Sequence, residues 1–226
     1  KLNAKHHLMA VAQEDACVEV FKLSGGHPFN KSYSRLSLDT WAIERGCLGT
    51  VTALQWNQDE EVICVGYAHQ GIAVFHFSGV CLMSTVQRFA APQENVKPSD
   101  TISKQIHTLC WDKEGYALVM AAQDAETFTQ ISFCKSTMTR NPSQNTQGPI
   151  MLQASDKVIV FHMADTDFLP DDLEVVALPT NYISQNWPVQ YVSVADDGSH
   201  IAAAGLRGCA IYNTSLKKWR VFGDEQ

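Results

Sequence analysis

The chain has 226 residues, of which 45% are hydrophobic and 18% are charged, and its formal net charge is −7. This composition excludes a disordered chain, because it supplies enough apolar side chains for a core and little net charge to oppose collapse. The negative charge argues against a protein that covers nucleic acid with a broad basic face, and the length suits one domain or a piece of a larger region.

The first part of the chain contains three short apolar segments that predict strands. They cover residues 8–12, 17–21 and 33–38, and polar residues separate them. We interpret residues 1–38 as the later strands of a four-stranded unit. Because the chain begins at Lys1 with no charged-then-apolar leader, we expect it to be an internal piece of a longer protein.

Residues 46–88 show the complete pattern of such a unit. Two apolar strands at 51–56 and 62–66 flank a polar turn, and a third strand at 71–77 and a fourth at 80–86 follow after short turns that contain glycine. Glycine is typical of tight turns because it adopts positive φ without strain. The spacing therefore predicts four antiparallel strands joined by hairpins.

The same pattern recurs twice further along the chain. Residues 106–121 align with 51–66, with Trp111 in the place of Trp56, and residues 189–205 align with both. Third and fourth strands of the last copy are expected at 208–212 and 217–222. We expect Trp56 and Trp111 to fill the space between adjacent sheets.

Repeated units of four short strands are typical of β-propeller blades. The sequence thus predicts an all-β fold, a WD40-type β-propeller that is incomplete, with about three and a half blades. The whole chain, 1–226, is expected to belong to one propeller region, and the expected blade-like units cover about 1–38, 46–88, 104–163 and 181–223.

Two polar segments are expected to be loop insertions that lengthen the repeat beyond the usual period of about 40–45 residues. They cover residues 89–103 and 135–149 and are rich in Pro, Gln, Ser, Thr and Asn. Residues 151–161 are expected to form an outer hairpin, and 169–177 at most a turn or two of helix. Because an open ring leaves strand edges exposed, we expect the isolated chain to aggregate or fold poorly.

Two stretches lack Asp, Glu, Lys and Arg, namely 62–87 and 175–195. Their length raises the possibility of a membrane-spanning helix. Glycines and polar residues interrupt the first stretch every few residues, and the second contains Pro179 and Pro188. We therefore expect buried strands and tight turns instead.

The residue types that carry catalysis or bind metals show no informative spacing. The seven cysteines are odd in number and contain no C-x-x-C pair, so we expect buried structural thiols and no structural zinc site. No phosphate-binding loop, nucleophile elbow or H-E-x-x-H motif occurs. The histidines are scattered along the chain: His6, His7, His27, His69, His76, His107, His162 and His200. We therefore predict no catalytic, cofactor-binding or metal-binding residues.

Two charged segments are candidates for partner contacts. The acidic segment 165–174 lacks the mid-loop glycine and the twelfth-position glutamate of a calcium loop, so we expect a solvated loop, which could carry a basic partner. The basic segment 217–220, Lys-Lys-Trp-Arg, is expected on an exposed outer strand, where lysine discourages edge pairing. Contact with an acidic partner or with membrane headgroups is the alternative.

A distinctive combination of segments near the end of the chain resembles a known family. Residues 181–190 read Asn-Tyr-Ile-Ser-Gln-Asn-Trp-Pro-Val-Gln, and Asp197-Gly198, Ala204-Gly205 and the segment 216–223 follow. Together they closely resemble the WD40 subunit of the Ric–Rgp complex, the Golgi exchange factor for a Rab GTPase. Residues 71–86 are similar to plant-type members. The resemblance extends over the whole chain and is thin at 87–105 and 135–149.

The resemblance implies a cytoplasmic protein that associates peripherally with the Golgi membrane. With an Rgp-type partner subunit it would promote GDP release from a Rab GTPase, supporting endosome-to-Golgi and intra-Golgi retrograde transport. It implies no nucleic-acid partner, no cofactor and no catalytic constellation in the subunit itself.

Two alternatives to this function stay open. The first is a WD40 scaffold of a vesicle coat or tether without exchange activity. The second is an enzyme that uses a propeller's central pocket, which would need acidic or histidine side chains near the axis. The strand pattern offers mainly Ala, Gly, Val and Cys there.

Overall fold

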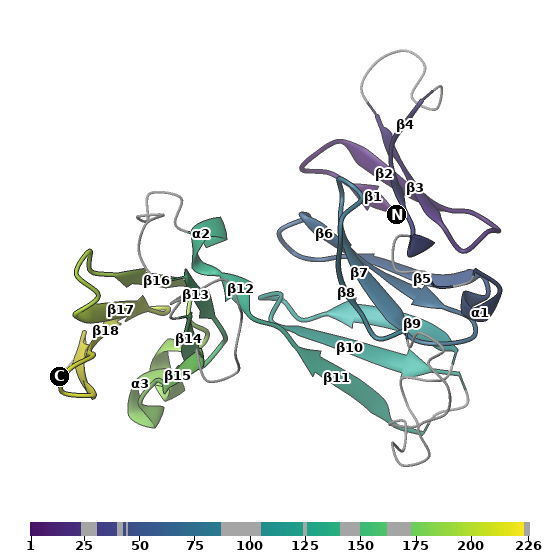
Figure 1. Cartoon of the computed structure of the whole chain (residues 1–226). Helices are drawn as coiled ribbons and strands as arrows, with labels where there is room; N and C mark the ends of the chain where they lie inside the picture. The colour runs from purple at the N-terminus through teal and green to yellow at the C-terminus, as the bar shows by residue number, and fades with distance from the viewer. Residues whose placement is uncertain are drawn as a thin grey trace. The chain divides into compact units, whose positions relative to one another are not determined.

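The structure is a computed structural model, and it describes residues 1–23, 31–39, 43, 45–86, 105–123, 126–140, 150–161 and 173–223 (Figure 1). The chain divides into two compact units, Lys1–Ser132 and Phe133–Gln226. Both units consist of small antiparallel sheets, and we call each sheet a blade, numbered in chain order.

Blade 1 is a meander in which each strand pairs with the next one along the chain. Its strands are β1 (Leu2–Asn3), β2 (Leu8–Ala12), β3 (Val18–Lys22) and β4 (Ser32–Leu36). Buried and more exposed residues alternate along β2 and the first part of β3, as expected for strands that place one face on a core. Strands β2, β3 and β4 lie within two residues of their predicted positions, whereas β1 was not predicted.

Blade 2 follows a short helix, α1 (Arg45–Leu48), and has the same meander topology. Its strands are β5 (Val51–Trp56), β6 (Val62–Tyr67), β7 (Ile72–His76) and β8 (Cys81–Ser84). Gly71 and Gly79 occupy its two later turns with φ of 71° and 106°, a region that favours glycine. The predicted glycine turns are therefore confirmed.

Blade 3 has three described strands, β9 (Ile106–Trp111), β10 (Ala117–Ala122) and β11 (Phe128–Ser132). Strand β9 lies against β5 and β6 of blade 2. The two sheets approach closely at Gly66, where an added Cβ would lie 2.8 Å from Cγ2 of Ile106. The hydroxyl of Thr52 also donates a hydrogen bond to the Ile106 carbonyl at 2.5 Å.

The second unit contains blades 4 and 5. Blade 4 comprises β12 (Lys135–Ser136), β13 (Ile150–Gln153), β14 (Lys157–Phe161) and β15 (Leu173–Ala177), with helix α2 (Thr137–Arg140) after β12. Helix α3 (Thr180–Asn186) precedes blade 5. Blade 5 comprises β16 (Tyr191–Val194), β17 (His200–Ala204), β18 (Cys209–Asn213) and β19 (Lys218–Phe222).

The structure differs from the sequence prediction between residues 104 and 186. The expected unit 104–163 is divided between two sheets, so the described residues form five sheets where about three and a half blades were expected. Strands β13 and β14 are the central strands of blade 4, not an outer hairpin. Residues 173–177 form β15 and not a helical turn, because β-branched Val175 and Val176 pair with β14.

The two predicted loop insertions have different outcomes in the structure. The segment 135–149 begins with β12 and α2, because Lys135 and Ser136 pair with β13; residues 141–149 lie outside the described part. The insertion 89–103 also lies outside the described residues.

Each unit has its own hydrophobic core. One core joins blades 1 and 2 and includes Val20, Ile63 and Phe75, and the other joins blades 4 and 5 and includes Val160 and Ile201. Both clusters arise because alternate strand residues face the neighbouring sheet. None of the helices in the described ranges has the length and apolar character needed to cross a membrane.

The two tryptophans aligned in the sequence repeat link neighbouring blades. The indole N–H of Trp56 in blade 2 donates to the Lys1 carbonyl of blade 1, and that of Trp111 in blade 3 donates to the Gln55 carbonyl of blade 2, both at 3.4 Å. Both side chains are buried. The prediction that they fill the space between sheets is confirmed.

Candidate functional site

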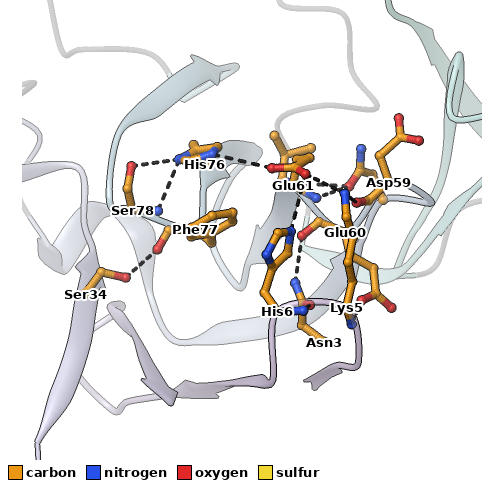
Figure 2. A network of polar contacts seen from close by, with 12 residues as sticks. Asn3, Lys5, His6, Ser34, Asp59, Glu60, Glu61, His76, Phe77 and Ser78 are labelled. Carbon is orange, nitrogen blue, oxygen red and sulfur yellow. Dashed lines mark hydrogen bonds and ion pairs between the residues drawn. The ribbon is translucent and has the colours of Figure 1, made fainter. Parts of the chain in front are cut away.

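A network of polar side chains joins blade 1 to blade 2 (Figure 2). It is formed by the turn between β1 and β2, the turn between β5 and β6, the end of β7 and one side chain of β4. Its members are Asn3, Lys5, His6, Ser34, Asp59, Glu60, Glu61, His76, Phe77 and Ser78. We call it the interblade network.

Glu61 is the centre of the interblade network. Its Oε1 accepts a hydrogen bond from Nζ of Lys5 at 2.6 Å and lies 3.3 Å from Nε2 of His6. Its Oε2 lies 3.9 Å from Nε2 of His76. The Lys5 hydrogen bond lowers the pKa of Glu61 below its usual value, with partial burial opposing the shift. The carboxylate is therefore ionised at neutral pH and attracts both histidines when they are protonated.

Both histidine rings contact the ring of Phe77. The ring centroid of Phe77 lies 4.7 Å from that of His6 and 4.2 Å from that of His76. The backbone N–H of Ser78 donates to Nδ1 of His76 at 3.3 Å, and the Ser34 hydroxyl donates to the Phe77 carbonyl at 2.5 Å. These contacts hold the imidazoles beside Glu61 and bring β4 to the end of β7.

Asn3 ties the two turns together from a buried position. Its Nδ2 donates to the Glu60 carbonyl at 2.7 Å, and its Oδ1 accepts from the His6 N–H at 2.9 Å. Lys5 adds two further bonds, from its N–H to the Glu60 carboxylate at 2.5 Å and from Nζ to the Asp59 carbonyl at 3.0 Å. The turn of blade 1 is thereby attached to the turn of blade 2 at several points.

The geometry of the interblade network suits attachment better than catalysis. A carboxylate whose pKa is lowered by a cation is a weak proton acceptor at neutral pH. Its side chains bond mainly to one another and to backbone groups. Across the described ranges of the chain, no group of three His, Cys, Asp or Glu side chains is arranged to hold a metal ion.

A second polar cluster anchors helix α3 to blade 5. Oδ1 of Asn186 accepts from the N–H groups of Arg207 and Gly208 at 3.0 and 2.8 Å, and its Nδ2 donates to the Tyr182 carbonyl at 3.1 Å. The Tyr182 hydroxyl donates to the Gly208 carbonyl at 2.7 Å and accepts from the Gly205 N–H at 2.9 Å. Two side chains of one helix thus bind the whole turn between β17 and β18.

Glycine is required at position 205 by this close approach. A Cβ at Gly205 would lie 1.9 Å from the carbonyl oxygen of Asn186, which is far inside van der Waals contact. The segments that carried the sequence resemblance, 181–190 and Ala204-Gly205, therefore meet in the folded chain. We call α3 with its hydrogen-bonded turn the α3 anchor.

The structure places the remaining histidines apart from one another. His69 and His200 contact nearby backbone or polar side chains at separate turns, and His107 is exposed on β9. His27 and His162 lie outside the described residues. The meeting of His6 and His76 at Glu61 was missed by sequence reasoning, because the three positions belong to turns of different blades and share no motif.

The seven cysteines form no disulfide with one another, and their burial varies. Cys17 and Cys64 are buried as predicted, and burial raises the pKa of the Cys64 thiol. Cys110 and Cys134 are exposed, contrary to the expectation of buried thiols. Cys110 differs because it occupies an exposed position of β9, where an apolar run does not imply burial of both faces.

The predicted basic strand is confirmed as an exposed outer strand. β19 is an edge strand of blade 5, and its Lys218 and Arg220 are exposed while Trp219 is half-buried. The indole N–H of Trp219 donates to the Ala177 carbonyl of blade 4 at 2.9 Å. The acidic segment falls mostly outside the described residues; only Leu173 and Glu174 are described, at the start of β15.

Serial antiparallel meanders that pack sheet on sheet within each unit define a protein built of β-propeller blades. Two family models agree with this class. The model described as the anaphase-promoting complex subunit 4 WD40 domain matches residues 1–96, and the model described as the RIC1 second beta propeller domain matches residues 154–226. The predicted WD40-type fold class is therefore confirmed.

Three curated relatives are similar to this chain. The chain is 23% identical to the guanine nucleotide exchange factor subunit RIC1 of Mus musculus and 22% identical to that of Homo sapiens, over 99% of this chain and 19% of each relative. It is 34% identical to the subunit ric1 of Schizosaccharomyces pombe over 48% of this chain and 11% of the relative. The chain is thus similar along nearly its whole length to a part of the RIC1 exchange-factor subunits, and the predicted resemblance is confirmed.

Proposed function

We propose that this chain is part of a subunit of a guanine-nucleotide exchange factor complex that promotes GDP release from a Rab GTPase. The observation that carries the proposal is the similarity to RIC1 subunits along 99% of the chain. Because the chain spans 19% of the length of those relatives, the activity belongs to the longer protein.

The partner and location follow from the resemblance of the segments around the α3 anchor. We propose an Rgp-type subunit as the partner within the complex and the Golgi membrane as the site of peripheral association. The complex would support endosome-to-Golgi and intra-Golgi retrograde transport.

Exchange of this kind depends on binding surfaces and not on a nucleophile. An exchange protein that binds the nucleotide-free GTPase more tightly than the nucleotide-bound form lowers the affinity of the GTPase for its nucleotide. The ratio of the two affinities is the same in both directions, because the two binding equilibria are linked. Broad and rigid blade surfaces suit that task. We therefore propose that the subunit has no catalytic constellation of its own.

The test is release of a fluorescent GDP analogue from candidate Rab GTPases. The full-length protein and its Rgp-type subunit are mixed with each loaded GTPase in the presence of excess GTP, with each subunit alone as a control. Acceleration over the intrinsic rate for one GTPase supports the proposal. An unchanged rate for every candidate overturns it and leaves a scaffold of a coat or tether as the better assignment.

A further inference from the structure

Blade 5 exposes several large apolar side chains near the α3 anchor. The exposed fractions are 47% for Trp187, 51% for Tyr191, 60% for Leu206 and 39% for Phe222. Exposed aromatic side chains in one place are typical of protein interfaces, where Trp, Tyr and Arg supply much of the binding energy.

Backbone contacts show that these residues surround one turn. The N–H of Leu206 donates to the Asn186 carbonyl, next to Trp187, at 3.3 Å, and the residue before Tyr191 bonds to the Ala204 carbonyl at 2.8 Å. The carbonyl of Phe222 lies beside Gly208, where an added Cβ would be 2.7 Å away. We call this set, Trp187, Tyr191, Leu206, Arg207 and Phe222, the α3 corner.

The α3 corner is held rigidly by the bonds of the α3 anchor. Asn186 satisfies two N–H groups of the turn that carries Leu206 and Arg207, and the Tyr182 hydroxyl bonds to both ends of the same turn. A surface already held in one conformation loses little entropy on binding, which favours affinity.

Among the residues that the structure describes, the charged side chains in and beside the α3 corner are arginines, although the whole chain carries −7. Arg207 is exposed, and the guanidinium of Arg220 lies 5.3 Å from the ring centroid of Phe222. In the part of the chain that the structure describes, neither arginine has a carboxylate within ion-pair distance. The opposite end of blade 5 is mixed, because Asp196 and Lys217 lie in its two touching turns.

We propose that the α3 corner is the docking surface for another protein subunit of the exchange-factor complex, which presents an apolar side chain beside a carboxylate. This inference rests on the proposed function for the identity of that subunit. Two arginines are too few for stable attraction to anionic lipid, which takes clusters of about four to eight basic residues. The apolar and aromatic side chains instead suit a pocket-filling protein contact.

The test compares two tandem substitutions in the full-length protein. Leu206→Asp with Arg207→Glu changes the α3 corner, and Leu216→Asp with Lys217→Glu changes an equally apolar and basic pair at the opposite end of blade 5. All four side chains are exposed, so both variants should fold. The dissociation constant for the purified Rgp-type subunit is measured by biolayer interferometry, and melting temperatures are recorded in parallel.

We expect the α3 corner variant to bind at least about tenfold more weakly while the control variant binds like the wild type. Equal affinity of all three proteins, or equal loss in both variants, would overturn the inference. Loss of binding to anionic vesicles with unchanged affinity for the subunit would also overturn it, in favour of a membrane contact.

Failure of the proposed function has a separate signature. If the wild-type complex assembles but does not accelerate GDP release, the proposed exchange role is wrong. The dissociation constants still decide in that case whether the α3 corner binds the subunit. If exchange occurs but the α3 corner variant binds normally, only the docking surface is wrong.

Discussion

The buried polar side chains of this chain show which of its turns pack together. Asn3 and Asn186 are both nearly fully buried, and each one bonds to a turn outside its own element: Asn3 donates to the Glu60 carbonyl, and Asn186 accepts from the Gly208 N–H. A buried N–H or carbonyl without a partner is destabilising, so such side chains determine which turns can pack together.

Replacing Asn186 by alanine should lower the free energy of unfolding of the second unit by about 2 kcal/mol, because two N–H groups of the β17–β18 turn lose their acceptor. Chemical denaturation followed by fluorescence measures the change. Gln185→Ala is the control, since Gln185 is exposed on the same helix. Equal stability of the two variants would contradict the role of Asn186 as an anchor.

Contacts between neighbouring blades stabilise the strands and turns of each blade. Blade 2 meets blade 1 through a shared hydrophobic core and a polar network around Glu61, and it meets blade 3 where the Ile106 side chain packs on Gly66. The polar network is partly exposed and screened by solvent, so it contributes less than the packing contacts. Packing should therefore dominate the attachment of blade to blade.

Gly66→Ala should destabilise the first unit by about 1–3 kcal/mol, because the new methyl group overlaps Ile106, including its branched Cβ at 3.0 Å. Thermal unfolding of the purified protein measures this loss of stability. Gly46→Ala is the matched control: no atom lies within 4 Å of its added Cβ, so its melting temperature should stay unchanged or rise. An unchanged melting temperature of the Gly66→Ala variant would mean that the two sheets separate easily at this point.

Glu61→Gln should make the first unit less stable at pH 7 by up to about 1 kcal/mol, because the Lys5 ion pair is lost. Since the pKa of Glu61 is lowered in the folded chain, its contribution is present above the unfolded-state pKa and is lost as the pH falls through the folded-state pKa. The difference between variant and wild type should therefore shrink in acid.

Denaturation at pH 7 and at successively lower pH values measures this difference. Glu14→Gln, at an exposed turn position, serves as the control, and its free energy of unfolding should stay close to that of the wild type both at pH 7 and in acid. A difference that persists at a pH where Glu61 is protonated in the folded chain would show that Glu61 acts through something other than its charge.

The whole chain contains two cores, each built from residues of one unit. The sequence repeat aligns Ile63 of the first unit with Ile201 of the second, and both are buried. Since neither core cluster includes residues of the other unit, local unfolding should be separable between them.

Ile63→Ala and Ile201→Ala should each reduce hydrogen-exchange protection only in their own unit, with a loss of about 2–5 kcal/mol there. Hydrogen exchange followed by mass spectrometry resolves the two units by peptide. The aligned position makes each variant the control for the other. Reduced protection in both units after either substitution would show that the chain unfolds as one cooperative block.

The local pattern of this chain was sufficient to predict the fold class, strands β2 to β4 of blade 1, the strands of blades 2 and 5 and the exposed basic strand. Alternation of apolar residues and glycine turns at Gly71 and Gly79 are local signals, so they can be read along the chain. The division of 104–163 into two sheets was not predictable in this way, because a short polar pair such as Lys135-Ser136 becomes a strand only by pairing with β13.

Only the tertiary structure decided which distant side chains meet. Glu61 lies between Lys5, His6 and His76 because turns of two blades are adjacent in space, although 55 residues of sequence separate His6 from Glu61. The segments around Tyr182 and Gly205 carry the resemblance in sequence, but only the folded chain shows that the helix binds the turn. Strand periodicity is a property of neighbouring residues, whereas a site is assembled by the packing of sheets.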